Sequence, residues 1–557
     1  MNTKIILTLI LAAAFIVRII GIGYGLPQEF VADEFLMVAV SLKMLDQKAW
    51  RPYYPDIFYH QPLTAYISLF GIGAYLAWEV VSGDFGSLAA LKEFYAIHSS
   101  DLLIVVRFLS AVFGSLTVLL LYFIGRDLFS KRAGILAALF GAFELLMAQF
   151  SQVGRVWSFL TFFIVLAFWF SIQVFRFGRL KDYLKSALAS GAAIMALLPG
   201  ILVFLPALIA RKFSLKDKKI WLAGGIVFLG IILAVFLNPR GLGVLLQRFD
   251  IQIPGLTEAV FKAPGNLPAI PPQPFSQRIF DAFVSLFNYA PIYFILFFVG
   301  LVILWRIDKR KLIFVSSFPA AYYLFIGPVF SYGERVRTVL PIMPFLVLVA
   351  AFTADYFLAK KIFAGKRFLS ALFILAISFY SIYFTAIFGI KVSRADTRTQ
   401  AIDWIYKNLP ENSRILVYSL SNDVVNQNRE VLKLLESVAP EDLNTRQRTF
   451  LSVDDSKYPK PEYFAWDLRK TPPEKLPPDF FRENRFRYLM QAYWGAEDGA
   501  QLESRLREKK LITSFKPFTS EIEFKENFAN NVRNPAKTLL TMERFGPIVE
   551  IYEISFK

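Results

Sequence analysis

Apolar runs of about 20 residues recur along this chain, and a run of that length crosses the hydrocarbon core of a bilayer as an α-helix. No other feature constrains the fold as strongly. The 557 residues are 55% hydrophobic and 16% aromatic, and 19% are charged, whereas soluble domains average about 25% charged residues. The sequence therefore predicts a polytopic α-helical membrane protein.

Clusters of Lys and Arg between the apolar runs predict the topology, because short cytoplasmic loops retain basic residues. They lie at 125–132, 176–185, 211–219, 306–311 and 359–367. With all of them inside, we expect about eleven transmembrane helices, the N-terminus inside and the C-terminus outside. The expected spans are 4–22, 102–124, 133–150, 157–175, a short pair in 186–210 broken at Pro199-Gly200, 220–237, 281–305, 312–330, 338–358 and 368–390.

Two apolar segments need separate treatment. The run at 4–22 is too long for the core of a typical signal peptide, so we expect a retained first helix. The run at 62–81 could also span, but a span there would place every later basic cluster outside. Its Tyr and Trp content suits a juxtamembrane helix on the outer face. We therefore predict that 62–81 lies along or dips into the outer interface.

Composition changes after the last apolar run. Residues 1–390 are expected to form the membrane domain and residues 391–557 an extracytoplasmic soluble α/β domain. There "AIDWIYKNLPENSRILVYS" predicts a helix, a turn and a strand, "RFRYLMQAYW" and "IVEIYEI" predict strands, and "AQLESRLREKK" predicts a helix. The net charge of +17 is a topology signal and does not favour a nucleic-acid partner, because the basic residues form short clusters. The absence of cysteine excludes disulfides and thiolate metal sites.

Charged residues collect at the outer ends of the predicted spans. Asp33 and Glu34 follow the first apolar run, Arg155 lies between two predicted spans, and Arg335 and Arg337 precede a later one. Arginines bind phosphate through charge-assisted, often bidentate hydrogen bonds. A carboxylate can deprotonate an incoming hydroxyl or hold a divalent cation that neutralises a leaving phosphate. The set suits a lipid-linked phosphate substrate. The residues leave the involvement of a metal ion open, with Asp33 as its ligand if there is one.

Each of these residues also has a purely structural interpretation. Asp33 could be the N-cap of the helix that follows, with Glu34 as a favourable first-turn acid. The arginines could extend to the membrane interface as anchoring side chains. His60, in the run "YHQPL", could make a structural hydrogen bond in a turn set by Pro62. Glu144 lies inside an apolar run, where a carboxylate is costly, and the sequence names no partner for it.

An ordered set of segments resembles one family of membrane proteins. "ADE" follows an arginine-bearing first helix, and "YHQPL", "RFLSAVFGSLTVLLLYFIGRDLFSKRAGILAALFGAF", "SQVGRVWSFLTFF" and "ERVRTVLPIMPFLVLVAAF" come after it. In this order they resemble the C-type membrane glycosyltransferases of the protein O-mannosyltransferase and aminoarabinose-transferase superfamily, over roughly residues 5–390.

The resemblance implies inverting transfer of a sugar from a polyprenyl-phosphate donor, on the non-cytoplasmic face, to a lipid, glycan or protein acceptor. Asp33 matches the family's catalytic acid and Glu34 its neighbour, while Tyr59, His60 and Gln61 match a substrate-binding run. It also implies a multi-pass protein of the plasma membrane, and the tail is similar to those of prokaryotic members.

Two positions depart from the family pattern. Gln61 replaces a residue of the usual proline-containing pair, and Trp157 stands where some members carry a second Asp. The second departure argues against a metal site built from two carboxylates. A transporter or flippase of lipid-linked sugars is the alternative function, since it would share the arginines. A sensor with a ligand-binding tail is a third, although it would leave the membrane-side acids unexplained.

Overall fold

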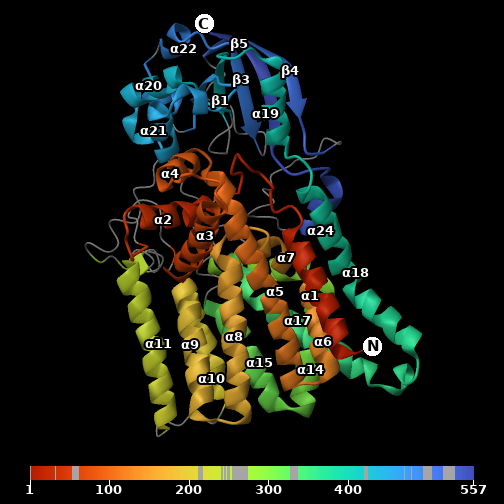
Figure 1. Ribbon diagram of the computed structural model, residues 1–557. Helices are drawn as coiled ribbons and strands as arrows, with labels where there is room; N and C mark the ends of the chain where they lie inside the picture. Colours follow the sequence, from red (N-terminus) through yellow and green to blue (C-terminus); the bar gives the residue numbers. More distant parts are fainter. Residues whose placement is uncertain are drawn as a thin grey trace.

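The chain folds as a long helical bundle with an α/β domain at one end (Figure 1). This computed structural model describes residues 2–31, 33–52, 60, 62–210, 217–239, 242–243, 246, 251, 253, 274–325, 336–418, 425–469, 471–477, 479–493, 505–518 and 534–556. The N-terminus lies on the bundle, and the C-terminus lies in the α/β domain.

The bundle consists of apolar helices that follow the predicted order. It comprises α1 (Thr3–Ile19), α5 (Leu102–Leu128), α6 (Lys131–Ala142), α7 (Leu145–Ser151), α8 (Val156–Arg176), α9 (Leu180–Ala196), η2 (Leu198–Phe204), α10 (Leu205–Ile209), α11 (Lys218–Leu237), α14 (Pro291–Ile307), α15 (Lys309–Phe325), η3 (Val336–Ile342), α17 (Met343–Leu358), η4 (Lys361–Phe363) and α18 (Arg367–Val392). Among the described residues, six helices are long and apolar enough to cross a membrane, or up to eight if each of two bent pairs is one span. The number of eleven stays a prediction.

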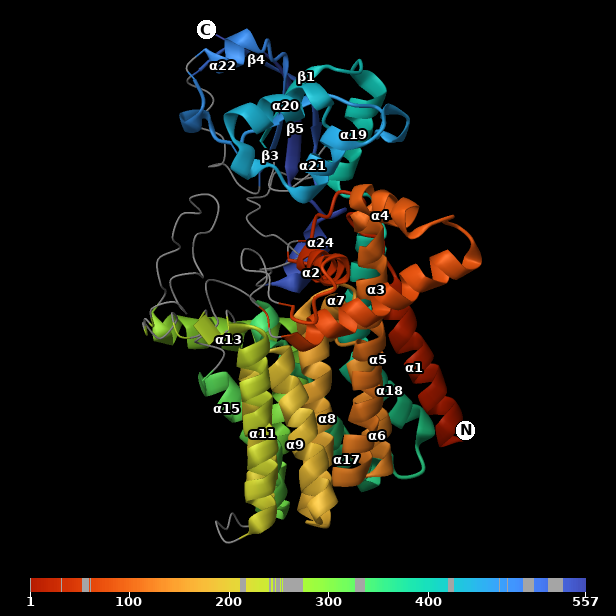
Figure 2. The ribbon, with the colours of Figure 1, turned by 60° about the vertical axis from the view of Figure 1, so that its left-hand side comes forward.

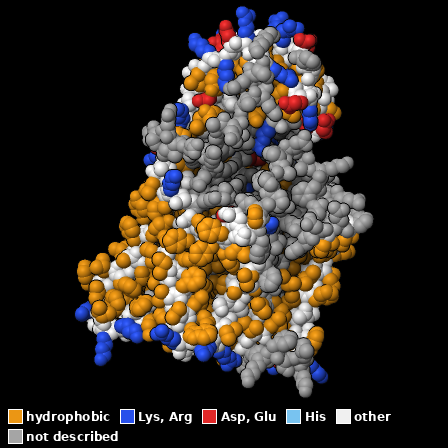
Figure 3. Space-filling model, turned by 180° about the vertical axis from the view of Figure 1, so that it is seen from behind, with side chains coloured by type: hydrophobic (Ala, Val, Ile, Leu, Met, Phe, Trp, Pro, Cys, Tyr) orange, Lys and Arg blue, Asp and Glu red, His pale blue; other side chains and the backbone are white. Residues whose placement is uncertain are grey.

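The two ends of the bundle differ in charge. Figures 1 and 2 place the turns from α5 to α6, from α8 to α9 and from α17 to α18 at the end away from the α/β domain. These turns carry predicted basic clusters. In the view from behind, hydrophobic side chains cover the bundle, and Lys and Arg line its lower edge (Figure 3). This separation is the one that the predicted topology requires, while the side of the membrane stays a prediction.

Two expected spans are bent. The run 281–305 was expected to be one span, but α13 (Phe275–Tyr289) meets α14 at 109° and lies across the end of the bundle (Figure 2). The prediction of a continuous helix there is wrong because Pro291, the first residue of α14, lacks an N–H and disfavours helix before it.

The other bend, of 59°, separates α6 from α7. Arg18 of α1 donates to the free carbonyls of Gly141 and Ala142 at 3.1 and 3.0 Å. Glu144 caps α7 and accepts from the N–H groups of Leu146 and Met147 at 3.1 and 2.7 Å. Two buried charges thus satisfy the backbone groups that the break releases.

The segment between α1 and α5 forms a layer on the end of the bundle that faces the α/β domain. It contains α2 (Phe35–Asp46), α3 (Pro62–Ser82), α4 (Leu88–Ile97) and η1 (Ser99–Asp101). Figure 2 shows α3 lying obliquely across the bundle helices rather than among them. This arrangement agrees with a juxtamembrane helix, although α3 is long and apolar enough to span, so its place in the membrane stays a prediction.

The C-terminal domain is a mixed five-stranded sheet with helices on both faces. The strand order is β2-β1-β3-β5-β4, with β1 parallel to β2 and β3, and β5 antiparallel to β3 and β4. Its elements are α19 (Thr397–Asn408), β1 (Arg414–Tyr418), α20 (Arg429–Val438), η5 (Pro440–Asp442), α21 (Thr445–Ser452), η6 (Asp455–Lys457), β2 (Phe464–Asp467), η7 (Pro473–Lys475), α22 (Phe480–Glu483), β3 (Tyr488–Tyr493), β4 (Leu506–Phe515) and β5 (Ile548–Phe556). The helix α24 (Pro535–Thr541) precedes β5 and packs through Leu539 against the apolar core of the bundle.

The helix predicted over "AQLESRLREKK" is wrong in its described part. Residues 506–515 form the edge strand β4, which pairs with residues 549–556 of β5. Local helix propensity is a weak prior that pairing with a neighbouring strand overrides. The charged side chains at 507–510 are exposed or half-buried, and exposed charges protect a sheet edge from aggregation.

Each face of the sheet has its own apolar core. Alternate strand residues such as Leu416, Trp466 and Leu489 pack with α20, α21 and α22 on one face. Residues such as Ile415 and Met490 pack with α19 on the other face. The second core also contains Phe30, which belongs to the loop after α1. The first loop is therefore part of the C-terminal domain's packing.

Candidate active site

A buried ion pair fixes the acidic segment at the end of the bundle. Glu34 and Arg107 are 0% and 1% exposed. Arg107 of α5 donates to the Glu34 carboxylate through Nη2 at 2.6 Å and through Nε at 3.2 Å. Its Nη1 donates to the backbone carbonyls of Ile22 and Tyr24 at 2.7 and 2.8 Å. One arginine therefore holds both ends of the loop that leads from α1 to α2.

The same carboxylate reaches the turn between α7 and α8. Glu34 Oε1 accepts a hydrogen bond of 2.5 Å from the N–H of Gly154. Their neighbours in the sequence, Asp33 before Glu34 and Arg155 after Gly154, are themselves paired at 3.3 Å. These contacts close a ring in which Glu34 fixes the backbones that carry Asp33 and Arg155.

Asp33 is shared between two arginines. Its Oδ2 lies 3.3 Å from Arg155 Nη2 and 3.2 Å from Arg337 Nη1. Arg155 is 3% exposed, while the Asp33 side chain is 33% exposed. The carboxylate thus faces solvent with the guanidinium groups behind it, and the three groups together carry one excess positive charge. This is an arrangement to which an anion is attracted.

Asp33 has a left-handed backbone, with φ at +67°. Asp is one of the few residues that tolerate this region. The helix α2 begins at Phe35 with Glu34 as its N-cap residue, and no side chain caps it. The alternative interpretation of Asp33 as an N-cap is therefore wrong. The Asp33 side chain instead pairs with the two arginines.

The arginines also set the protonation state of Asp33. Burial would raise the pKa of the carboxyl, but the nearby guanidinium groups of Arg155 and Arg337 outweigh it and lower the pKa to about 2. Trp157 lies behind this group, with the Arg337 guanidinium 5.9 Å from its ring centroid, a distance that permits a cation–π interaction. Trp157, which stands where some members of the resembled family carry a second Asp, thus contacts the Arg337 guanidinium instead of supplying a carboxylate.

His60 lies near this group and is neutral. Burial lowers the pKa of its imidazole to about 4, and the positive charges of Arg337 and Arg155 add to that effect while Asp33 opposes it. Asn238, at the end of α11, donates to the backbone carbonyl of His60 at 2.6 Å and fixes that part of the loop.

Three predicted site residues, Tyr59, Gln61 and Arg335, lie outside the described residues. The described ones, Asp33, Glu34, His60, Arg155 and Arg337, come together at one end of the bundle, with Glu34 turned into the interior and Asp33 turned outward.

The described residues do not form a fitting site for a divalent cation. No group of three or more His, Asp or Glu side chains gathers among them. Asp33 already faces two guanidinium groups, and Glu34 is occupied by Arg107 and the Gly154 N–H. Hard cations require several free oxygen ligands. The site offers positive charge to an anion rather than oxygen ligands to a metal.

Arg107 is the main site residue that sequence reasoning missed. It opens the family-typical stretch that begins "RFLSAVFG", and the sequence names no partner for it. An arginine near the start of the apolar helix α5 is costly without a counter-ion. This cost indicates from the sequence that a carboxylate lies near Arg107, but it does not identify that carboxylate.

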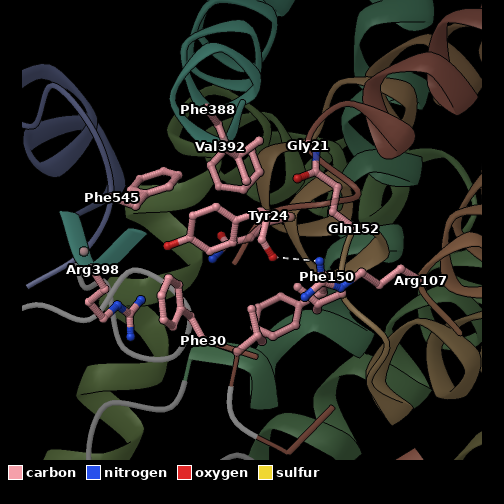
Figure 4. A pocket seen from close by; sticks show the side chains of 14 residues that line it. Gly21, Tyr24, Phe30, Arg107, Phe150, Gln152, Phe388, Val392, Arg398 and Phe545 are labelled. Carbon is pink, nitrogen blue, oxygen red and sulfur yellow. Dashed lines mark hydrogen bonds between the residues drawn. The ribbon is translucent and has the colours of Figure 1, made fainter. Parts of the chain in front are cut away.

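A small cavity of about 40 Å³ lies behind the ion pair, large enough for about one or two water molecules. Figure 4 shows Tyr24 in the middle of its lining, between Phe388 and Val392 of α18 on one side and Phe30 on the other. Arg398 of the C-terminal domain and Arg107 lie at opposite ends of the view. The cavity therefore adjoins the loop that carries Asp33 and touches both domains.

These observations define the class of the protein. It is a membrane-embedded helical protein with arginines around an outward-facing carboxylate. The model of the family described as dolichyl-phosphate-mannose-protein mannosyltransferase matches residues 88–238. This stretch includes Arg107, Gly154 and Arg155. The match confirms the predicted resemblance to membrane glycosyltransferases that use polyprenyl-phosphate sugars.

Solved structures with a similar chain path include ArnT from Cupriavidus metallidurans in the apo state, with a TM-score of 0.48 and 13% identity over 91% of this chain and 95% of that chain. ArnT bound to undecaprenyl phosphate gives 0.46 and 14% over 87% and 92%. The archaeal oligosaccharyltransferase AglB from Archaeoglobus fulgidus, with an inhibitory peptide and a dolichol-phosphate, gives 0.45 and 12% over 87% and 69%. A sequence search of curated proteins finds no match.

Proposed function

We propose that this protein is an inverting glycosyltransferase that moves a sugar from a polyprenyl-phosphate donor to an acceptor hydroxyl on the non-cytoplasmic face of the membrane. The observation that carries the proposal is the position of Asp33 between Arg155 and Arg337, at the polar end of an apolar bundle. The family match supports the donor class, because dolichyl phosphate is a polyprenyl phosphate.

The arginines bind the donor phosphate in this proposal. Arg155 and Arg337 supply hydrogen-bond donors from nearly dry positions, where charge–charge interactions are strong. During transfer the bond between the anomeric carbon and the phosphate oxygen breaks, and its electron pair stays on the phosphate. Stabilising that growing negative charge is the largest electrostatic requirement of the reaction. Arg335, which lies outside the described residues, is proposed as a further phosphate ligand.

Asp33 orients and deprotonates the acceptor. The acceptor heteroatom attacks the anomeric carbon from the side opposite the phosphate, and its proton passes to Asp33 Oδ2. A carboxyl with a pKa of about 2 is a weak base. The donor phosphate competes for the same two guanidinium groups, and their withdrawal from Asp33 raises its basicity when the donor is bound. Asp33 thus holds the arginines in place until phosphate arrives.

Glu34 acts through position rather than by touching substrate, since its carboxylate is buried against Arg107. His60, with Tyr59 and Gln61 beside it, is proposed to contact the donor or the acceptor as a neutral hydrogen-bonding group. The acceptor class, whether lipid, glycan or protein, stays open. The C-terminal domain lies over the same end of the bundle (Figure 1), which supports its placement outside together with the site.

The test is transfer of labelled sugar in membranes by wild type and by Asp33→Asn. We expect the variant to lose at least about 100-fold in kcat, the range for removal of a general base. Asp46→Asn is the matched control, because Asp46 is an exposed aspartate at the end of α2 that pairs with Lys92 at 3.1 Å. Wild-type turnover by a folded Asp33→Asn protein would refute the assignment of Asp33.

The same assay separates an enzyme from a flippase of lipid-linked sugars. A glycosyltransferase releases free polyprenyl phosphate in the same molar amount as glycosylated acceptor. A flippase moves the labelled donor across the bilayer and leaves the bond between sugar and phosphate intact.

A further inference from the structure

The first loop and the C-terminal domain meet at a buried polar cluster of Tyr24, Asp396 and Arg398, the junction cluster. The Tyr24 hydroxyl donates to Asp396 Oδ2 at 2.6 Å. Asp396 and Arg398 are 2% and 5% exposed. The contact joins residues 372 positions apart in the sequence, and it lies where the chain leaves α18 for the C-terminal domain.

The domain side of the cluster is rigidly built. Asp396 caps α19 by accepting from the Arg398 N–H at 2.9 Å, and it accepts from Arg398 Nε and Nη2 at 2.8 and 3.0 Å. With the Tyr24 hydroxyl, its carboxylate receives four hydrogen bonds. Such a carboxylate and guanidinium fix each other's orientation, so the acceptor offered to Tyr24 has a defined position.

The loop side inserts into the domain. The Phe30 ring lies 3.8 Å from the Arg398 guanidinium carbon and packs in the apolar core beneath α19. Figure 4 shows the Tyr24 ring enclosed by Phe30, Phe545, Phe388 and Val392, which come from the loop, the C-terminal domain and α18. Two aromatic side chains of one loop are therefore held by the domain above the site.

A short path of contacts leads from the junction cluster to Asp33. The backbone carbonyl of Tyr24 accepts from Arg107 at 2.8 Å, the contact drawn in Figure 4. Arg107 holds Glu34, and Glu34 is bonded along the chain to Asp33. The left-handed backbone of Asp33 is a sparsely populated conformation that surrounding structure must maintain.

We propose that the C-terminal domain positions Asp33 for catalysis, with Tyr24, Asp396 and Arg398 as positioning residues. The inference rests on the proposed function and adds a role for the domain to it. The domain holds Tyr24 and Phe30. Arg107 holds the carbonyls of Ile22 and Tyr24 and the carboxylate of Glu34, and Asp33 lies in the chain between Phe30 and Glu34. Loss of the upper support lets the segment move without removing any group that touches substrate.

Tyr24→Phe is the sharpest perturbation, since it removes the hydroxyl that crosses the junction and keeps the ring. The matched control is Tyr458→Phe. Tyr458 is buried, and its hydroxyl donates at 2.6 Å to the carbonyl of Gln427 within the C-terminal domain. Each variant loses one hydrogen bond of the same length. The bond lost in Tyr24→Phe crosses the junction, and the bond lost in Tyr458→Phe does not.

Two measurements are made on the full chain in detergent. Hydrogen–deuterium exchange follows the backbone amides of residues 22–34, and steady-state kinetics with a polyprenyl-phosphate sugar give kcat and KM. For Tyr24→Phe we expect faster exchange in this segment. We also expect a kcat lowered between about fivefold and 100-fold, the range for a small misplacement of a catalytic group, and a donor KM within about twofold of wild type, since the phosphate-binding arginines remain. Tyr458→Phe should match wild type in both measurements.

Three outcomes would overturn the proposal, and a fourth concerns the glycosyltransferase assignment. Exchange at the wild-type rate in Tyr24→Phe overturns the proposal, and so does faster exchange with an unchanged kcat. An equal loss of kcat in Tyr458→Phe also overturns it, because the effect would then be general loss of stability. If wild type transfers no sugar, the glycosyltransferase assignment fails, while the exchange rates still report whether the domain holds the segment.

Discussion

The Glu34–Arg107 pair offers the most quantitative test of how this site is built. Glu34→Gln keeps the shape of the side chain and removes its charge. In wild type the carboxylate accepts from the Arg107 guanidinium and from the Gly154 N–H. A glutamine has one oxygen acceptor and one N–H₂ donor, so one of these donors must face another donor. The Arg107 guanidinium also keeps its charge without a counter-ion in a site that is 1% exposed.

The size of the effect follows from that geometry. Removing one partner of a buried ion pair costs about 3–5 kcal/mol, because the remaining charge stays buried. Arg107 keeps its bonds to the carbonyls of Ile22 and Tyr24, so we expect the lower end, about 3 kcal/mol. In Glu34→Gln combined with Arg107→Gln the buried charge is gone. The two changes should therefore be less than additive, with a coupling of about 2 kcal/mol, within the range for contacting residues.

The assay is reversible unfolding in mixed micelles, with all four proteins of the cycle compared under one condition. Asp46→Asn, which breaks an exposed ion pair, serves as the control and should leave unfolding unchanged. The reasoning is refuted if Glu34→Gln unfolds like wild type, or if the free energies of the two single variants add without coupling. Either result would mean that the pair does not hold the acidic loop.

Two further predictions concern pH and the domain junction. The pKa of His60 in the folded protein is about 4, below its ordinary value of 6.5, so the unfolded chain binds the extra proton and stability falls as the pH drops from about 6.5 to about 4. The apparent melting temperatures at pH 7 and pH 5 should therefore differ less in His60→Gln than in wild type. The control His98→Gln, which alters a partly buried imidazole, should change this difference in melting temperature less than His60→Gln does. Gly546 has a φ of +119°, and a Cβ there would collide with Thr397. Gly546→Ala should therefore lower the melting temperature far more than Gly365→Ala, where φ is +74° and the space is open; equal shifts would contradict the close packing at the junction.

The order of the apolar helices was predictable because hydropathy and basic loops act over short stretches of chain. The sequence predicts the breaks between helices less accurately. Pro291 was visible in the sequence, yet a run of apolar residues on both sides suggested one helix over 281–305. The structure instead turns α13 across the bundle end. The strand β4 was missed for a different reason, since its partner β5 lies about 40 residues further along the chain, and no local pattern reports that pairing.

The candidate site was predictable in part. The sequence placed Asp33, Arg155 and Arg337 at one end of the bundle, and the structure brings them within hydrogen-bonding distance. The different orientations of Asp33 and Glu34 were not visible, because adjacent residues in a loop have no fixed periodicity. Glu34 is turned inward to Arg107 and the Gly154 N–H, and Asp33 is turned to Arg155 and Arg337. All of these partners lie far away in the sequence.

Buried arginines link the apolar helices, which the sequence predicts, to segments of irregular backbone, which it does not predict. Arg18 and Arg107 both lie in apolar helices, where an unpaired charge is costly. Each satisfies backbone carbonyls at a place where the chain departs from helix, Arg18 those of Gly141 and Ala142 and Arg107 those of Ile22 and Tyr24. A guanidinium can do this because it has five donors in a fixed plane. In this chain each of these arginines therefore lies beside irregular backbone, and the irregular segment held by Arg107 leads to Asp33.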